Sequence, residues 1–146
     1  MKLLIQRVSS CSVKVDGETV GAIGSGALVL LGIHRDDTSE QIDPLVKRLV
    51  NLRFFSDEAG KTNLSLLDTG GELLIVSQFT LYADCRTGRR PSFTDVASGD
   101  RAKELYEAFV ATARTHVTRV ETGRFAAKME VSLVNDGPFT LVVEDR

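Results

Sequence analysis

Two short segments combine polar side chains with turn-forming residues in a way that could act on a substrate. Ser77, Gln78 and Thr80 place three hydrogen-bonding side chains around Phe79, directly behind an apolar stretch. Residues 135–138 read Asn-Asp-Gly-Pro, a turn-forming sequence that precedes another apolar stretch. Structural roles explain both equally well, the first as a strand leaving the core and the second as a hairpin loop. The residues alone therefore indicate only a weak candidate site.

The common catalytic and metal-binding groups lack the partners that they would need. Of the two histidines, His34 follows an apolar run and His116 ends a predicted helix. We expect both side chains at the surface. No serine lies in a G-x-S-x-G elbow, so a Ser-His-Asp triad is not indicated. Cys11 and Cys85 have neither C-x-x-C nor Cys/His spacing, which disfavours a disulfide framework and a zinc site. We expect no metal and no cofactor.

Cys85 stands beside three arginines, Arg86, Arg89 and Arg90. Nearby cations lower the pKa of a thiol and make it a better nucleophile, but no histidine is in evident reach to act as a base. The guanidinium groups could instead bind phosphate, because their geometry matches phosphate oxygens. A loop that binds the phosphates of a nucleic acid and an ordinary solvated loop fit these residues equally well.

Composition limits the classes of protein to which the chain could belong. The 146 residues are expected to form one domain, and 42% hydrophobic against 26% charged residues excludes a disordered chain. With 18 basic and 20 acidic residues the net charge is −2, which disfavours a broad nucleic-acid or membrane surface but permits a narrow contact with one RNA end. Without a signal peptide or an 18-residue apolar run, a cytoplasmic protein is predicted.

Apolar periodicity predicts several strands and two helices. Thr38 and Gln41 form a capping box before a first helix, and Asp16-Gly17 suits a type I′ hairpin turn. The first helix has an apolar stripe at Ile42, Leu45, Val46 and Leu49, and the second at Ala102, Leu105, Tyr106, Phe109, Val110 and Ala113. Strands are predicted at residues 3–5, 13–15, 20–23, 27–33, 73–81, 128–133 and 140–143. This pattern predicts an α+β domain with a curved or barrel-like sheet covered by two helices.

Six blocks spread over the chain resemble the D-aminoacyl-tRNA deacylase family of the bacterial and eukaryotic type, and they occur in the family's order. They are residues 1–18, N-L-S-L at 63–66, S-Q-F-T-L-Y-A-D at 77–84, G-R-R-P-S-F at 88–93, E-T-G-R-F at 121–125 and V-S-L-V-N-D-G-P at 131–138. The resemblance implies a homodimeric hydrolase that cleaves the ester between a D-amino acid, or glycine, and the tRNA 3′ end.

The resemblance also implies which residues form the site. Catalytic residues would be Ser77, Gln78, Phe79 and Thr80, and substrate-binding and chiral-selectivity residues would be Gly137, Pro138 and Met129. The Gly137-Pro138 bond would be cis and would enter the active site of the partner subunit. The sequence departs from the family pattern at Phe139, where valine is usual, and at Thr62, where methionine is frequent. Phe139 is expected to point into its own subunit.

The absence of a triad fits a reaction that needs no protein nucleophile. An aminoacyl ester is already activated, and the ribose 2′-OH can assist the attack of water. The backbone N–H groups of Gln78, Phe79 and Thr80 are the candidates for stabilising the oxyanion. The Thr80 hydroxyl as nucleophile is an alternative, although it has no evident base.

Chirality would follow if the Gly137 and Pro138 carbonyls flanked the substrate α-carbon and collided with an L side chain. Two hypotheses from other classes remain. One is a catalytically silent module that binds an RNA end or an amino acid, and the other is a hydrolase that uses Cys85.

Overall fold

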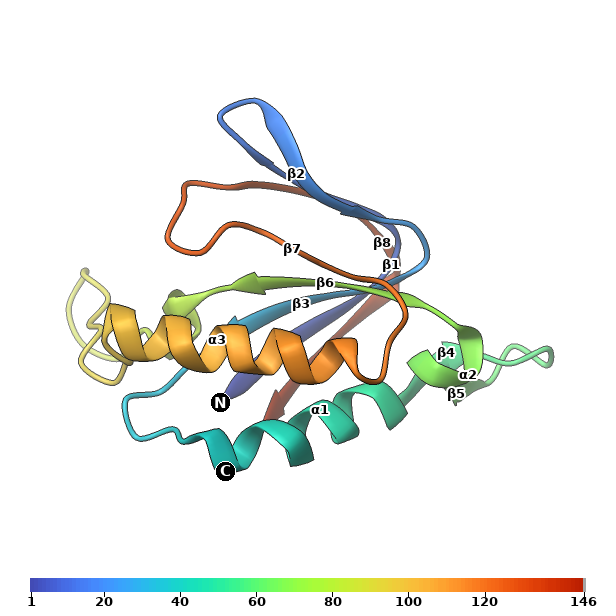
Figure 1. Ribbon diagram of the computed structural model, residues 1–146. Coiled ribbons are helices and arrows are strands. Elements are labelled where there is room, and N and C mark those ends of the chain that lie inside the picture. The colour runs from blue at the N-terminus through green and yellow to red at the C-terminus, as the bar shows by residue number, and fades with distance from the viewer. Residues whose placement is uncertain (146) are drawn as a thin grey trace.

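The computed structural model describes residues 1–145, and it contains eight strands and three α-helices (Figure 1). The strands are β1 (Lys2–Val15), β2 (Glu18–Ile23), β3 (Gly26–Gly32), β4 (Arg53–Ser56), β5 (Thr62–Ser65), β6 (Glu72–Ser77), β7 (Val120–Thr122) and β8 (Glu130–Glu144). The helices are α1 (Ile42–Asn51), α2 (Leu66–Thr69) and α3 (Gly99–Arg114), with 3₁₀ turns η1 (Ser39–Gln41) and η2 (Phe79–Tyr82). The predicted α+β class is confirmed.

The long first strand organises a curved six-stranded sheet. β1 pairs antiparallel with β8 along one edge, and along its other edge first with β3 and then with β2. β6 and β7 extend the sheet from β3 in parallel. The two outermost strands of this path, β2 and β7, approach each other. A Cβ built on Gly21 of β2 would collide with the carbonyl oxygen of Thr122 in β7, which shows how close they lie. The sheet is therefore nearly closed into a barrel.

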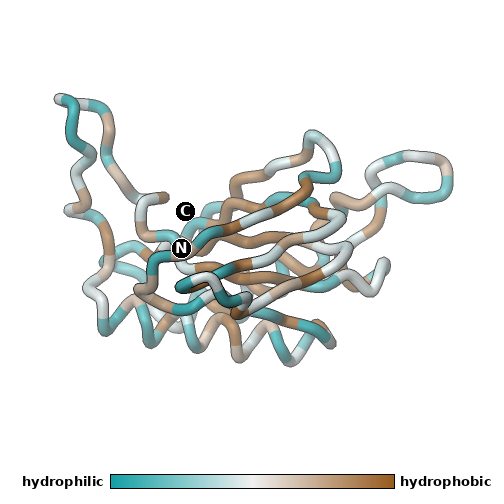
Figure 2. The backbone as a smooth tube through the Cα atoms, turned by 90° about the horizontal axis from the view of Figure 1, so that it is seen from above, coloured by the Kyte–Doolittle hydropathy of each residue, from teal (hydrophilic) through white to brown (hydrophobic). Residues whose placement is uncertain are grey.

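Helices α1 and α3 lie side by side against one face of this sheet (Figure 1). Each buries the stripe that its periodicity predicts, with Leu45 and Leu49 from α1 and Phe109 from α3 fully enclosed. Apolar residues concentrate along the strands, whereas the projecting loops are mostly polar (Figure 2). A smaller core inside the curved sheet includes Cys11, and burial raises the pKa of its thiol to about 11. Cys11 is thus a packing residue.

Local signals are confirmed where the chain makes short-range structure. Asp16 and Gly17 both have positive φ, 50° and 81°, as a type I′ turn requires. Gln41 closes the predicted cap, its Oε1 accepting from the Thr38 N–H at 2.8 Å. The segments predicted as two strands at residues 3–5 and 13–15 are one continuous strand.

Three predictions fail because of tertiary contacts. Residues 135–138 form no hairpin loop, since β8 runs on through them and pairs with β1 on both sides. Residues 6–8 of β1 face residues 135–140 of β8, so the extra residues bulge outward. The strand predicted to continue to residue 81 ends at Ser77 and turns into η2. His34 is only 13% exposed in its side chain, because its ring packs edge-on against Tyr82 at 5.1 Å.

Candidate active site

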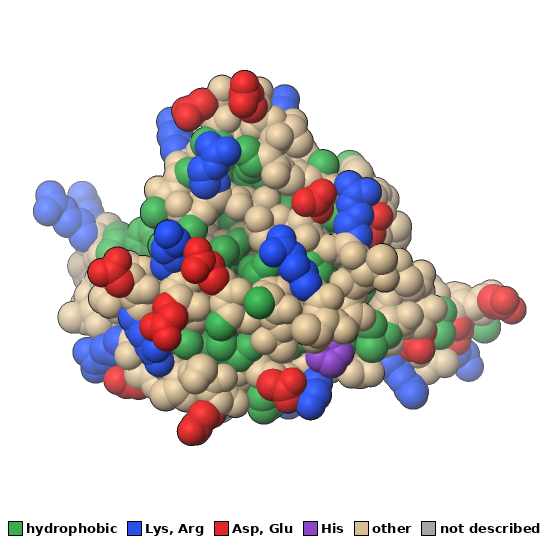
Figure 3. Space-filling model, viewed as in Figure 1, with side chains coloured by type: hydrophobic (Ala, Val, Ile, Leu, Met, Phe, Trp, Pro, Cys, Tyr) green, Lys and Arg blue, Asp and Glu red, His purple; other side chains and the backbone are tan. Residues whose placement is uncertain are grey.

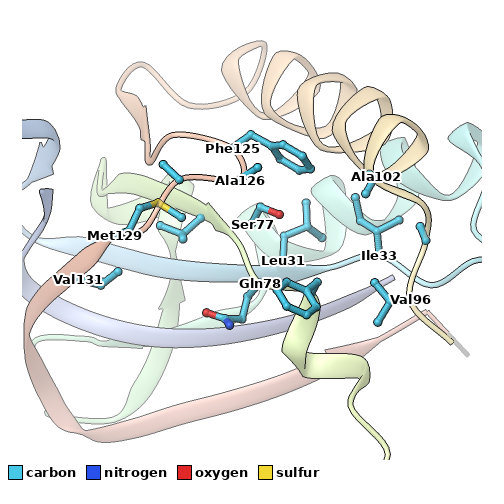
Figure 4. A pocket seen from close by; sticks show the side chains of 15 residues that line it. Leu31, Ile33, Ser77, Gln78, Val96, Ala102, Phe125, Ala126, Met129 and Val131 are labelled. Carbon is cyan, nitrogen blue, oxygen red and sulfur yellow. The ribbon is translucent and has the colours of Figure 1, made fainter. Parts of the chain in front are cut away.

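A pocket of about 480 Å³ opens where β6 ends (Figure 4). Its walls come from β3, β6, the start of α3 and the segment between β7 and β8. The lining residues are Leu31, Ile33, Val76, Ser77, Gln78, Phe79, Val96, Ala97, Gly99, Ala102, Phe125, Ala126, Ala127, Met129 and Val131. No ionisable side chain is among these residues. Any proton transfer in this pocket would have to involve hydroxyl, amide or substrate groups.

The structure brings four of the predicted site residues together at this pocket. Ser77, Gln78, Phe79 and Met129 all line it. Ser77 is the last residue of β6, and its side chain faces the cavity (Figure 4). Its hydroxyl has no hydrogen-bond partner within the described part of the chain, residues 1–145, so it is free to bind a ligand.

The backbone amides at this position differ in their availability. The Gln78 N–H donates to the Leu31 carbonyl at 2.8 Å and thereby extends the pairing of β6 with β3. The prediction that this amide stabilises an oxyanion is therefore wrong. The N–H groups of Phe79 and Thr80 begin η2, where the first amides of a helical turn have no carbonyl behind them. Neither has a partner among residues 1–145, so these two amides remain available to a ligand.

The side chains of η2 support this turn. Gln78 Nε2 donates a short hydrogen bond to Thr80 Oγ1, which fixes the hydroxyl beside the pocket rather than in its lining. The Phe79 ring is 53% exposed and meets the ring of Phe93 edge-on at 5.2 Å. Phe79 thus presents an exposed aromatic ring at the pocket, where a base could stack.

The position of the Met129 side chain depends on Gly123, which leaves space for it. A Cβ on Gly123 would lie 2.5 Å from Met129 Sδ, so only glycine leaves room for the methionine in its present position. Phe125 was identified from the sequence only within the block E-T-G-R-F, and Ala126 was not predicted as a site residue. Ala126 has φ +60° and carries the chain around the pocket, a strained position that side-chain chemistry alone does not reveal.

The Asn-Asp-Gly-Pro segment lies elsewhere on the surface. Gly137 and Pro138 are exposed on the bulge of β8, and neither lines the pocket of its own chain. The Gly137-Pro138 bond is cis, as predicted. Within residues 1–145 the structure therefore does not bring this motif to residues 77–80.

Contacts within the same chain hold the bulge in place. Arg7 Nε donates to the Asp136 carbonyl and Arg7 Nη1 to the Phe54 carbonyl, both at 2.7 Å. The same guanidinium lies 4.5 Å from the centre of the Phe139 ring, which packs toward Phe54 with ring centroids 6.3 Å apart. Phe139 thus points into its own chain, and that prediction is confirmed. The arrangement braces the exposed Gly137-Pro138 pair from behind.

The arginine loop is separate from the pocket lining. Arg86 forms a fork with Asp84, Nε at 2.8 Å and Nη2 at 2.6 Å, and the guanidinium holds the pKa of that carboxyl well below its usual range. Arg86 is therefore already engaged, whereas Arg89 and Arg90 are exposed. Cys85 is exposed in a shallow cavity that no histidine among residues 1–145 lines, so a base for it is still missing.

Comparison with known proteins identifies the family to which the chain is similar. A family model described as D-Tyr-tRNA(Tyr) deacylase matches residues 4–144. D-aminoacyl-tRNA deacylases of Thermosipho africanus and Desulfatibacillum aliphaticivorans are 57% and 54% identical over 146 residues, covering all of this chain and 98% and 100% of those proteins.

Solved structures give the same fold. One described as c-Myc DNA unwinding element binding protein superposes with a TM-score of 0.95 at 39% identity and covers 100% of this chain and 99% of its own. Another, a probable eukaryotic D-amino acid tRNA deacylase, has a TM-score of 0.86 at 20% identity, with 97% of each chain covered, and supports the fold alone. No helix within residues 1–145 is long and apolar enough to cross a membrane. On the family match and these identities, the chain belongs to the D-Tyr-tRNA(Tyr) deacylase family.

Proposed function

We propose that this protein hydrolyses the ester bond of D-aminoacyl-tRNA and releases the free D-amino acid and tRNA in the cytoplasm. Family membership supports the reaction class. The observation that carries the mechanism is the pocket itself, which has no ionisable lining residue but offers the unpartnered amides of Phe79 and Thr80 at its edge. Such a site favours substrates that are already activated, and an aminoacyl ester is one.

The chemical step then depends on position and on backbone dipoles. The oxygen of a water molecule, assisted by the ribose 2′-OH, attacks the ester carbonyl carbon while its proton passes to the ribose oxygens or to solvent. The developing oxyanion accepts hydrogen bonds from Phe79 and Thr80 N–H. Collapse breaks the bond to the ribose oxygen, which leaves as the hydroxyl of the tRNA end. The Ser77 hydroxyl is free to orient the substrate.

Selectivity for D-amino acids requires a second subunit in this proposal. Gly137 and Pro138 are exposed and braced but absent from their own pocket, which supports a homodimer in which each chain supplies them to its partner. Their carbonyls would flank the α-carbon and collide with an L side chain. Glycine has no side chain to exclude, so glycyl-tRNA would also be hydrolysed.

The direct test compares purified protein on D-tyrosyl-, L-tyrosyl- and glycyl-tRNA. We expect rapid loss of the D-tyrosyl and glycyl esters and retention of the L-tyrosyl ester. Binding of D-tyrosyl-tRNA without hydrolysis would contradict the reaction and favour the silent binding module.

The shared site has its own test. Two inactive variants, Phe79→Pro, which lacks the backbone N–H, and Gly137→Val, are mixed under conditions that allow subunit exchange. A site built from two chains predicts partial recovery of activity, because some hybrid dimers contain one intact site. No recovery despite verified exchange, or a fully active monomer in sedimentation, would refute the dimer.

A further inference from the structure

A second cavity of about 390 Å³ adjoins the candidate active site. Phe125 belongs to the lining of both cavities, so a single aromatic wall separates them. The second cavity lies between α3 and the segment that follows β7, and it is lined by Lys103, Tyr106, Glu107, Val110, Arg114, Thr122, Gly123, Arg124 and Phe125. The proposed mechanism uses no charged group from it.

The side chains that line this cavity carry a net positive charge, opposite in sign to the net charge of the whole chain. Lys103, Arg114 and Arg124 face a single carboxylate, Glu107, although the protein carries a net charge of −2. Glu107 and Lys103 form only a loose pair, with 3.9 Å between Oε1 and Nζ on exposed side chains. Figure 3 shows Lys and Arg side chains interspersed with Asp and Glu on the face that carries α3 and β7.

The two arginines are available to a ligand. Arg114 Nη2 makes one long contact, 3.5 Å, with the Val120 carbonyl. The Arg124 guanidinium has no ion-pair or hydrogen-bond partner within residues 1–145. By contrast, Arg86 of the separate arginine loop is already engaged by Asp84. Arg124 without a partner and Arg114 with one weak contact, both beside an aromatic wall, are suited to a polyanion that passes Phe125.

We propose that this cavity, with Arg124 and Arg114 as its principal ligands, binds phosphodiester groups of the single-stranded 3′ end of the tRNA. The inference rests on the proposed function, because a terminal nucleoside whose ester lies at Phe79 and Thr80 must lead its chain out of the first pocket. Phosphate groups that lie beyond Phe125 would reach the guanidinium groups of Arg124 and Arg114, whose geometry matches phosphate oxygens. A local grip of this kind also explains how a chain with net negative charge holds RNA.

The test distinguishes phosphate binding by this cavity from catalysis of ester hydrolysis. Arg124→Ala and Arg114→Ala are measured on D-tyrosyl-tRNA and on D-tyrosyl-adenosine, an ester without phosphate. We expect the ratio of kcat/KM for tRNA to that for adenosine to fall about three- to tenfold in each variant, with partial rescue in Arg124→Lys. Affinity for an uncharged RNA ending in CCA should become less dependent on salt, with the log–log slope falling by about 0.7 for each phosphate that is no longer neutralised. Lys47→Ala, an exposed lysine on α1, is the matched control and should change nothing.

The outcomes are distinguishable. An unchanged ratio and an unchanged salt slope would overturn the phosphate site, and so would equal losses on both substrates, since these indicate a structural role. A fall confined to Arg89→Ala and Arg90→Ala would assign the grip to the loop instead and would also overturn it. If the wild-type protein hydrolyses neither ester, the proposed function fails, whereas Arg124-dependent RNA binding still tests the cavity independently.

Discussion

The side chain of Asn135 binds both backbone groups of Phe139, four residues further along the chain. Nδ2 donates to the Phe139 carbonyl at 2.9 Å, and Oδ1 accepts from the Phe139 N–H at 3.0 Å. Nδ2 also donates to the Arg7 carbonyl of β1 at 3.0 Å. One amide side chain thus closes the bulge and attaches it to the neighbouring strand, so Gly137 and Pro138 project without losing the pairing of β8.

Asn135→Ala should therefore loosen the bulge. The variant cannot form these three hydrogen bonds, and the free energy of unfolding should fall by about 1–3 kcal/mol. In the proposed dimer, activity on D-tyrosyl-tRNA should fall further than the folded fraction explains. Urea unfolding and deacylation rates measure the two effects. Asn51→Ala, which removes an exposed bond to the Lys47 carbonyl, is the control and should leave both nearly unchanged. An Asn135→Ala variant as active as wild type would contradict the role of the bulge.

Gly123→Ala should change the shape of the pocket by displacing Met129, which lines it. The new Cβ would lie 2.5 Å from Met129 Sδ, so the methionine must move and alter the pocket wall. We expect a raised KM for D-aminoacyl-tRNA, and partial recovery when Met129→Ala is added. Gly24→Ala is a suitable control, because its Cβ would meet only the Glu72 carboxylate at 3.9 Å. Unchanged kinetics in Gly123→Ala would show that the position of Met129 does not matter.

The pH dependence of hydrolysis should show no enzyme group titrating near neutrality. None of the residues lining the pocket is ionisable, so the plot of log kcat/KM between about pH 5.5 and 8.5 should have no bell shape. A rise with pH would reflect ionisation of the attacking oxygen. A bell-shaped profile would indicate a protein acid and base and would contradict the mechanism.

Neither Thr80 nor Cys85 should act as a nucleophile. Thr80→Ala keeps the backbone amide and should retain substantial deacylation, as should Cys85→Ala. Replacing the amide of residue 80 by an ester, introduced with an α-hydroxy acid, removes only the N–H and should cost roughly 10²–10³ in kcat. Mass spectrometry that detects an acyl-enzyme on either side chain would refute this prediction.

Asp37 should be essential for stability. Its Oδ2 lies 2.8 Å from the α-amino nitrogen of Met1 and accepts the His34 N–H at 2.7 Å, and the charged pair is fully buried. Asp37→Asn leaves a buried cation without its counter-charge, so the free energy of unfolding should fall by about 3–5 kcal/mol. Asp36→Asn, at an exposed carboxylate, is the matched control. Equal denaturation midpoints for the two variants would contradict this role.

Local chemistry made part of this structure predictable. The apolar stripes of α1 and α3 depend on helical periodicity, and the turn at Asp16 and Gly17 depends on φ preferences of single residues. The motif around Gly137 indicated the cis bond through family resemblance. The polar groups at residues 77–80 indicated only a weak candidate site by themselves, and the family resemblance predicted their catalytic role.

Contacts between distant parts of the chain decided the rest. The bulge at residues 135–138 exists because Asn135 reaches the Arg7 carbonyl, 128 positions away in the sequence, and periodicity carries no information on such a bond. The Gln78 amide is engaged because β6 pairs with β3, which left only Phe79 and Thr80 as free donors. The sequence by itself determined the two main helices, the hairpin turn at Asp16 and Gly17, and the absence of charged catalytic groups around residues 77–80. Only the folded chain determined which backbone groups stay unpaired, because a hydrogen bond depends on where its partner lies in space.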